Sequence, residues 1–495
     1  MQGIDIHKLA EALLYQEKDP LFFNSAFFML FFGLFLLVYV LSYQINKLRV
    51  YLLTFFSLYF FYKTCGWYVG FILLAAFFDY NISHTIYSTT NKNSRKKLLV
   101  CSIIANVGLL FYFKYTNFFL NIANDFAAHK VHPLKLILPV GISFYTFENL
   151  SYTIDVYKGV FKPVRKFIDY LFFLSFFPKL LMGPIVRAAD FVPQIHKKPV
   201  VTNQQVGEGL YLITAGIIKK VIISDYINAN YVINIFDNPG AHTGIECLLA
   251  VYGYPMVIYC DFSGYSDMAI GMAKWMGFDI NINFLSPYQS ATIGEFWKRW
   301  HISLASWLKD YVYIPLGGNK EGKFNTYKNL MITMLLGGFW HGASWNFLFW
   351  GALQGTALIA EKLRTGMGRQ YLLVLPWSAK ATRVAATIIT FHFVCLGWVF
   401  FRCDTFSNSW VMLGQIAGNF HFNLLKPLFN GYKMVFVMLF IAMVLHGISF
   451  KKEGSFRQLV VNLPLPLKII YFFLCIYIAI QFKQAEIIKP IYLQF

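Results

Sequence analysis

Charged residues are scarce in this chain: only 14% of its 495 residues are Asp, Glu, Lys or Arg, against roughly 25% in soluble domains. Hydrophobic residues make up 57% and aromatic residues 19% of the sequence, and the mean hydropathy is +0.51. Apolar runs such as 21–41 and 52–78 recur along the chain, and about 20 apolar residues suffice to cross a bilayer. The composition therefore excludes an ordinary soluble enzyme and predicts an all-α polytopic protein embedded in a lipid bilayer.

Several motifs of common chemistries are also missing. The sequence contains no Walker loop, no G-x-G-x-x-G, no H-E-x-x-H and no G-x-S-x-G. Its seven cysteines are scattered without a C-x-x-C pair, which predicts neither a disulfide framework nor a metal site. No internal repeat is visible, and this weighs against the inverted-repeat plan of many transporters. We expect no bound cofactor and no metal.

The positive charge of the chain does not indicate nucleic-acid binding. The net charge is +19, but the basic residues gather in short segments between apolar runs, as the positive-inside bias of membrane proteins requires. These segments are Lys47 to Arg49, Arg95 to Lys97, Lys162 to Lys166, Lys197 to Lys198 and Lys451 to Lys452. We therefore expect a membrane topology and no nucleic-acid partner.

The chain is predicted to form one transmembrane domain over 20–495, preceded by a polar segment at 1–19. We expect no cleavable signal peptide there, and the apolar residues at helical spacing fit either a helix on the membrane surface or a helix packed on the protein. The apolar pattern predicts about ten to twelve spans, and the longest loop outside them is 402–432. Pro, Gly and charged residues interrupt 136–157, 170–190 and 286–316, so we expect re-entrant segments around a central cavity.

His341 lies in an apolar stretch, Gly337-Gly338-Phe339-Trp340-His341-Gly342-Ala343-Ser344-Trp345. An ionisable residue at membrane depth is costly and is by default a candidate functional residue. The glycines let a neighbouring helix or a substrate approach closely, and Trp340 and Trp345 are predicted to wall the imidazole. A neutral imidazole suits general-base work on a hydroxyl. The alternative is a structural histidine that bonds a carbonyl of an adjacent helix.

His301 lies in a second stretch, Phe296-Trp297-Lys298-Arg299-Trp300-His301-Ile302-Ser303-Leu304. If 295–310 is one helix, Trp297, Trp300, His301, Leu304, Trp307 and Leu308 share one face, whereas Arg299, Ser303, Ser306 and Asp310 share the opposite one. This pattern predicts an interfacial helix that carries His301 inward. A histidine that only packs in the core fits equally well. The residues that follow, Tyr313 to Asn319, predict a helix break and a tight turn.

Carboxylates within apolar stretches form a second group of candidates. Glu148, Tyr152 and Asp155 share a helical face in the stretch that begins at Pro139, and Asp261 and Asp267 flank Ser263 to Tyr265. Each carboxylate either lines a polar tunnel or cross-links helices, and we favour cross-linking. The segment from Phe177 to Arg187 resembles a re-entrant turn, whose cations are candidates to meet an anionic donor.

The two histidine motifs, together with Pro139 to Glu148, Pro178 to Arg187, Tyr311 to Asn319 and the terminal Tyr492-Leu493-Gln494-Phe495, resemble the membrane-bound O-acyltransferase (MBOAT) family. The match is closer to its alginate O-acetylation branch than to its D-alanyl branch. The resemblance covers about residue 20 to the end, and the polar 1–19 segment departs from it. It implies a funnel fold with a tunnel, His341 as the catalytic histidine and His301 as a second active-site histidine.

The resemblance also implies how such a protein acts. An acyl donor, acetyl-CoA or an acyl-carrier thioester, would bind from the cytoplasm of a bacterial cell at the cytoplasmic (inner) membrane. The acyl group would pass outward to an exported polysaccharide, often through a periplasmic or extracellular esterase-like partner. The alternatives are a D-alanyl transferase that uses a carrier-protein thioester, and a proton-coupled transporter. Candidate residues for binding donor or substrate are Trp340, Trp300, Arg299, Asp310, Asn319, Lys179, Glu148, Tyr145, Asp261 and Asp267.

Overall fold

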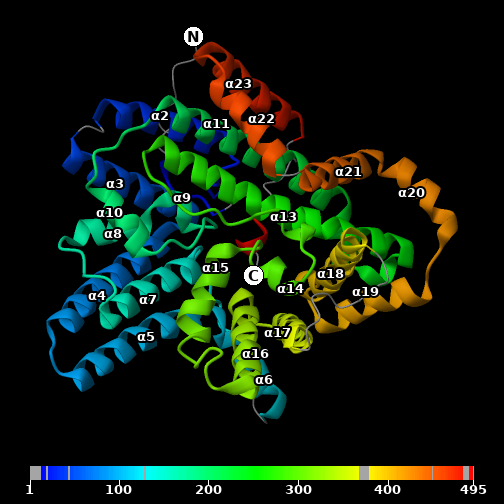
Figure 1. Cartoon of the computed structure of the whole chain (residues 1–495), viewed down its shortest axis with the longest axis horizontal. Helices are drawn as coiled ribbons and strands as arrows, with labels where there is room; N and C mark the ends of the chain where they lie inside the picture. The colour runs from blue at the N-terminus through cyan, green and yellow to red at the C-terminus, as the bar shows by residue number, and fades with distance from the viewer. Residues whose placement is uncertain are drawn as a thin grey trace. The chain divides into compact units, whose positions relative to one another are not determined.

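The computed structural model describes residues 13–17, 20–42, 45–127, 130–366, 378–448, 450–482 and 490–493. Within these ranges the chain contains helices and connecting segments but no strand, which confirms the all-α prediction (Figure 1). Most of the 1–19 segment lies outside the described residues, so its predicted surface helix stays a prediction. The chain divides into two compact units, 1–209 with 268–281 and 210–267 with 282–495, and each is described by itself.

The first unit consists of nine α-helices and one short 3-10 helix among its described residues, besides the parts of two helices that it shares with the second unit. They are α2 (Ala26–Ser42), α3 (Asn46–Cys65), η1 (Gly66–Tyr68), α4 (Val69–Ser88), α5 (Lys92–Lys114), α6 (Thr116–Phe126), α7 (Ile142–Lys158), α8 (Phe167–Ser175), α9 (Phe177–Leu180) and α10 (Ala188–Ile195). The two shared helices are α11 (Asn203–Ile217) and α13 (Gly244–Trp275).

A buried carboxylate joins α4, α5 and α7 in the first unit. Asp79 is fully buried and accepts hydrogen bonds from Ser102 Oγ at 2.6 Å and Asn106 Nδ2 at 2.7 Å. Thr153 Oγ1 of α7 lies 3.3 Å from the same carboxylate. Buried polar groups are stable only when they are hydrogen-bonded, so this cluster fixes the packing of three helices. No pattern in the sequence pointed to Asp79.

Among its described residues the second unit contains long α-helices, short helices and three π-helical stretches, η2, η3 and η6. They are η2 (Ile218–Asp225), η3 (Asn228–Val232), α12 (Ile233–Asp237), η4 (Pro239–Ala241), η5 (Pro287–Gln289), α14 (Ile293–Trp297), α15 (Ile302–Leu308), η6 (Lys309–Tyr313), α16 (Gly322–His341), α17 (Trp345–Gly366), α18 (Ala379–Arg402), α19 (Phe406–Gly418), η7 (Phe422–Leu424), α20 (Leu425–Gly431), α21 (Lys433–Gly447), α22 (Phe450–Asn462), α23 (Leu465–Phe482) and η8 (Ile491–Leu493).

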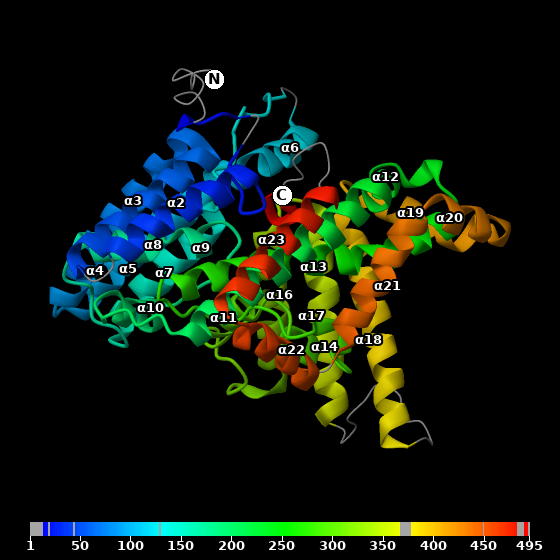
Figure 2. The same cartoon turned by 90° about the horizontal axis from the view of Figure 1, so that it is seen from above.

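Glycines set the packing of α16 on α17, which run beside each other in Figures 1 and 2. A Cβ atom at Gly338 would lie 2.3 Å from the carbonyl oxygen of Phe347, and one at Gly351 would lie 2.6 Å from that of Met334. Only hydrogen fits at these positions, because the neighbouring atoms belong to backbone. The glycines near His341 therefore admit a neighbouring helix, as one of the two sequence-based interpretations predicted.

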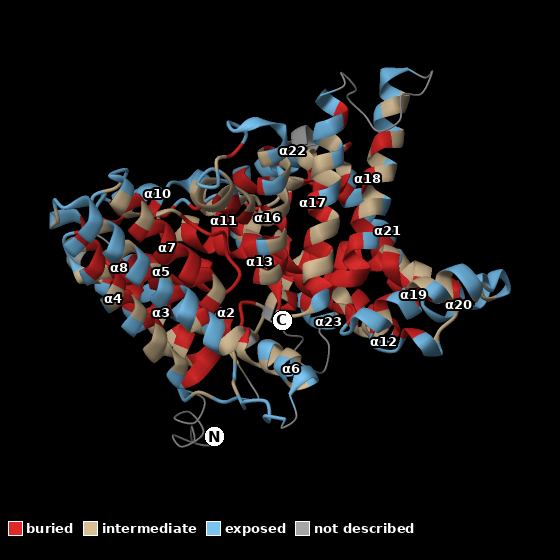
Figure 3. Cartoon of the chain, turned by 90° about the horizontal axis from the view of Figure 1, so that it is seen from below, coloured by how far each residue is buried: buried red, intermediate tan, exposed pale blue. Residues whose placement is uncertain are grey.

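Five helices among the described residues are long and apolar enough to cross a membrane, or six if the bent pair 422–431 and 433–447, with 91° between its parts, is one span. The prediction of ten to twelve spans also included helices that are shorter or carry more charge than these. The 402–432 loop is largely helical in α19 and α20, and α20 is mostly exposed (Figure 3). The expected interruptions occur in 170–190 and 286–316, whereas 142–158 is one unbroken helix, α7.

Candidate active site

The predicted helix over 295–310 is wrong, because the chain breaks next to the histidine. The helix α14 ends at Trp297 and α15 begins at Ile302, and His301 between them adopts a left-handed conformation with φ of 43°. A non-glycine residue in this region is uncommon and often marks a functional site. The break alters which side chains of this segment are buried. His301, Leu304 and Trp307 are buried as predicted, but Ser303, which was predicted to lie on the outer face of the helix, is buried too.

Asn283 holds this break in place, although nothing in the sequence pointed to it. Its buried side-chain oxygen Oδ1 accepts hydrogen bonds from Ser303 Oγ at 2.9 Å and from the Ser303 N–H at 3.2 Å. His301 Nδ1 lies 3.3 Å from the same oxygen, and the Ile302 N–H donates to the Asn283 carbonyl at 3.0 Å. One asparagine thus fixes the start of α15 and orients the imidazole ring.

His301 is fully buried among aromatic rings. The Phe262 ring stands edge-on to it, with 4.7 Å between centroids and 90° between planes, and Trp340 lies at 6.2 Å. Burial lowers the pKa of His301, because a low-dielectric environment disfavours the charged imidazolium. The ring is therefore neutral near pH 7, so that one ring nitrogen can donate a hydrogen bond and the other can accept one.

His341 is the last residue of α16 and is 4% exposed. Its ring lies 4.9 Å from Trp340, 5.1 Å from Phe401 and 5.3 Å from Trp350 between centroids. Trp340 thus forms part of the wall as predicted. Trp345 does not, because it lies at the start of α17 with 59% of its surface exposed.

Tyr492 connects the two histidines. Its ring lies 5.3 Å from His341 and 6.0 Å from His301 between centroids, so both histidines share Trp340 and Tyr492 as neighbours. In the sequence this residue stands out only as part of the terminal motif, and no role was predicted for it. A pair of buried imidazoles within one aromatic shell, from which water is largely excluded, is suited to proton transfer to and from a bound substrate.

Asp261 positions the segment that carries Tyr492. Its Oδ2 accepts a hydrogen bond from the Ile491 N–H at 3.0 Å, and its Oδ1 pairs with Lys220, which also pairs with Asp225. All three charged side chains are buried. The carboxylate therefore connects the π-helical stretch η2, α13 and the C-terminal segment, as the cross-linking interpretation of the intramembrane carboxylates predicted.

The remaining polar candidates in the second unit lie outside the aromatic shell. Asp267 pairs with Lys219 at 2.7 Å, and both side chains are partly exposed. Asp310 is half-buried in η6, and Asn319 is exposed in the predicted turn, where Gly317 and Gly318 have positive φ. The Asn329 side chain fixes that turn through hydrogen bonds to the carbonyls of Leu316 and Gly318.

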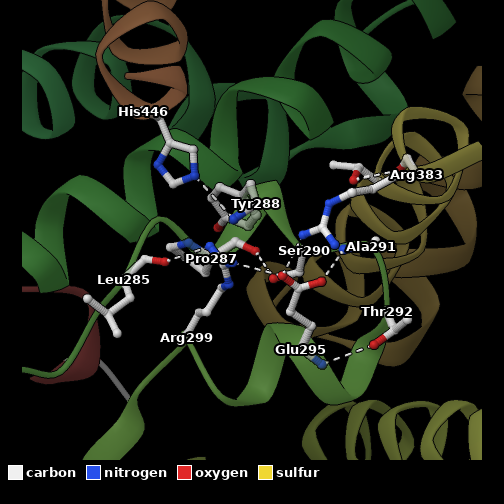
Figure 4. A network of polar contacts seen from close by, with 11 residues as sticks. Leu285, Pro287, Tyr288, Ser290, Ala291, Thr292, Glu295, Arg299, Arg383 and His446 are labelled. Carbon is white, nitrogen blue, oxygen red and sulfur yellow. Dashed lines mark hydrogen bonds and ion pairs between the residues drawn. The ribbon is translucent and has the colours of Figure 1, made fainter. Parts of the chain in front are cut away.

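Arg299 belongs to a polar network around Glu295, at the N-terminal end of α14 (Figure 4). Arg299 Nη2 and Arg383 Nη2 lie 2.8 Å and 3.0 Å from Glu295 Oε1, and the Ala291 N–H donates to Oε2 at 2.9 Å. Desolvation raises the pKa of Glu295, but the Ala291 N–H and the two arginines outweigh it and leave the pKa below its usual value. The network fastens α14 to α18. Trp300, buried beside it, packs on Trp398.

Two candidates of the first unit, Lys179 and Glu148, are paired with each other. Lys179 of α9 and Glu148 of α7 form a buried ion pair, and the Val186 N–H donates to Glu148 Oε1 at 3.3 Å. Lys179 Nζ also lies 4.3 Å from the Phe173 ring centroid, and Tyr145 is buried one turn before Glu148. This pairing favours a structural role for Lys179 and Glu148 over contact with an anionic donor.

Comparison with known proteins assigns a family to this arrangement. The model of the membrane-bound O-acyltransferase family, MBOAT, matches residues 20–403. A peptidoglycan O-acetyltransferase from Helicobacter pylori is 36% identical over 69% of this chain and 68% of its own length. The probable alginate O-acetylase AlgI from Pseudomonas aeruginosa is 39% identical over 79% and 74%. A teichoic acid D-alanyltransferase from Bacillus subtilis is 31% identical over 56% and 71%.

Proposed function

The chain belongs to the membrane-bound O-acyltransferase family, and we propose that it transfers acetyl groups from acetyl-CoA to an exported polysaccharide. As a multi-pass membrane acyltransferase it needs an acyl donor. Its relatives support acetyl as the acyl group, since the peptidoglycan O-acetyltransferase and the probable alginate O-acetylase each align over more than two thirds of this chain. The family also favours an enzyme over a proton-coupled transporter.

The observation that carries the mechanism is the shared aromatic shell of His341 and His301. His341 would take the proton of the acceptor hydroxyl as its oxygen attacks the thioester carbonyl. The new C–O bond forms, the C–S bond breaks, and the proton passes to the departing thiolate. His301, oriented by Asn283, would stabilise the developing oxyanion or orient the donor.

The donor would enter from the cytoplasm of a bacterial cell, and the acetyl group would leave on the outer face of the cytoplasmic membrane. The immediate acceptor is either a sugar hydroxyl or the serine of an esterase-like partner outside the membrane. Holding donor and acceptor together within the protein would supply much of the rate, because it makes the reaction effectively unimolecular. Trp340, which contacts both histidines, would fix the position of the acyl group.

Isolated membranes with labelled acetyl-CoA test this function. We expect wild-type membranes to pass label to a translocated ester, and His341→Ala and His341→Gln to lower the rate at least about a hundredfold, the usual contribution of a general base. His392→Ala is the matched control, since His392 is exposed on α18. Wild-type transfer by both His341 variants would refute the assignment.

A D-alanyl transferase is the second candidate, because the Bacillus subtilis relative shares 31% identity over 56% of this chain. The same membranes distinguish it when they receive a D-alanyl carrier-protein thioester in place of acetyl-CoA. Transfer from the carrier protein alone would replace acetyl by D-alanine and leave the role of His341 intact. Transport of a solute without any acyl donor would contradict both enzymes.

A further inference from the structure

A cavity of about 350 Å³ lies between α14, α17 and α18, in the second unit. This volume is within the usual range of small-ligand sites, roughly 300–1,000 Å³. Its wall is mainly apolar and includes several small side chains, which leave the space between the helices unfilled. Leu353, Ala357, Ala360, Ala386, Ile389 and Phe393 form the apolar part. The rings that pack on the two histidines, among them Trp340 and Tyr492, are not part of its lining.

One wall of the cavity belongs to a helix that can cross a membrane. The helix α18 has a mean hydropathy of 2.0 over its most apolar window. Val384 and Ile388 on the same helix are 53% and 52% exposed, which leaves large apolar side chains facing outward next to the cavity. On a helix that can cross a membrane, exposed apolar side chains of this kind are typical of a lipid-facing surface, so the bilayer can supply an apolar occupant of the cavity.

A charged pair lies on α17 in the wall of this apolar space. Glu361 and Arg364 are one helical turn apart, and both line the cavity. Arg364 is only 7% exposed, and its Nη1 has no hydrogen-bond partner in the described part of the chain. An unsatisfied buried donor is destabilising, and more so when it is charged. Such a guanidinium is complementary to a phosphate or carboxylate, which it can bind through two parallel hydrogen bonds.

Glu361 supplies the opposite charge. Its Oε2 accepts a hydrogen bond from the Gly294 N–H at 2.7 Å, which ties α17 to the first turn of α14. A Cβ at position 294 would lie 2.8 Å from Oε1, so the glycine is what allows the carboxylate to approach. Among the described residues Oε1 accepts no hydrogen bond, and it is available to a cation. The cavity thus combines one cationic and one anionic group with apolar walls.

We propose that this cavity binds a phospholipid with a zwitterionic ethanolamine headgroup. The phosphate would pair with Arg364, the ammonium with Glu361, and an acyl chain would lie along the small side chains of α17 and α18. The charges favour this occupant over an anionic lipid, since a second negative group would face Glu361. A soluble CoA molecule offers phosphates but has no bilayer-borne acyl chain to fill the apolar part.

Lipid analysis of the purified full-length protein tests the proposal. The protein is reconstituted in nanodiscs of phosphatidylcholine that contain a small fraction of phosphatidylethanolamine or phosphatidylglycerol, and retained lipid is measured after extraction into detergent. We expect phosphatidylethanolamine to be retained by wild type and at least tenfold less by Arg364→Gln. Lys362→Gln, which removes an exposed cation of the same helix, should retain it fully.

A second variant distinguishes loss of lipid binding from misfolding of the protein. Ala357→Phe fills the apolar part of the cavity and leaves Arg364 in place, so it should lose the lipid while the thermal transition of the protein persists. Equal retention by Arg364→Gln and Lys362→Gln would overturn the site, and so would displacement of the lipid by excess acetyl-CoA. Equal retention of phosphatidylglycerol would overturn the zwitterionic headgroup.

Discussion

Replacing Gly338 by alanine tests whether the close packing of α16 on α17 sets the position of His341. Gly338 lies one turn before the histidine on α16. The added methyl would lie 2.3 Å from the Phe347 carbonyl oxygen and 3.1 Å from the Gly351 Cα. Both contacts are with backbone, so a side-chain rotation cannot relieve them, and the two helices must move apart.

The size of the effect follows from the overlap. A methyl carbon and an oxygen normally stay more than 3 Å apart, so α16 must shift by roughly an ångström near Gly338, and overpacking of this kind costs about 1–3 kcal/mol. A displacement of about 1 Å at catalytic groups can lower a rate a hundredfold. We therefore expect Gly338→Ala to lower both the thermal transition and the rate of acetyl transfer, the rate by about tenfold to a hundredfold.

The matched control is Gly414→Ala, also within a helix of the second unit, where an added Cβ meets nothing within 4 Å. This change should leave activity intact and slightly raise stability, since alanine favours a helix over glycine by about 1 kcal/mol. Acetyl transfer is measured in membranes and the thermal transition in detergent. Wild-type activity in Gly338→Ala would refute the link between helix packing and the histidine.

Two further changes test the supports of the site. Asp261→Asn weakens the charge-assisted hydrogen bond from the Ile491 N–H, so the rate of acetyl transfer should fall about tenfold. The control Asp267→Asn changes a partly exposed ion pair on the same helix and should keep the wild-type rate. Equal rates in the two variants would contradict the anchoring role of Asp261. The lowered pKa of Glu295 stabilises the fold above the unfolded value of about 4.3, and this contribution disappears as pH falls through the lower folded value. Glu295→Gln should therefore lower the thermal transition near pH 7, and the difference from wild type should shrink as the pH falls below the unfolded value. A difference that stays constant as the pH falls would contradict the ion network.

The sequence predicted those features that depend on local composition. Apolar runs predicted an all-helical membrane protein, and the cost of an ionisable group at membrane depth singled out His341 before any fold was known. The turn at Gly317 and Gly318 follows from its glycines, whose positive φ the structure shows. Helical periodicity failed at His301, because Asn283, about twenty residues away, stabilises a left-handed residue where a continuous helix was expected. Periodicity carries no signal of such a partner.

Long-range contacts also explain why the prediction for Trp345 was wrong and why no role was predicted for Tyr492. Trp345 was predicted to contact His341 because it is aromatic and close in sequence. In the structure α17 begins at Trp345, whose ring is exposed. Trp350 and Phe401 pack against His341 instead. Tyr492 belongs to the C-terminal segment, far from the histidines along the chain. It lies beside them because Asp261 binds the backbone of the preceding residue, Ile491. The catalytic candidates are thus recognised by their own chemistry, whereas the groups that position them are recognised only from the fold. Variants of the positioning groups are therefore the sharper test of this structure, since they alter activity only if these contacts exist.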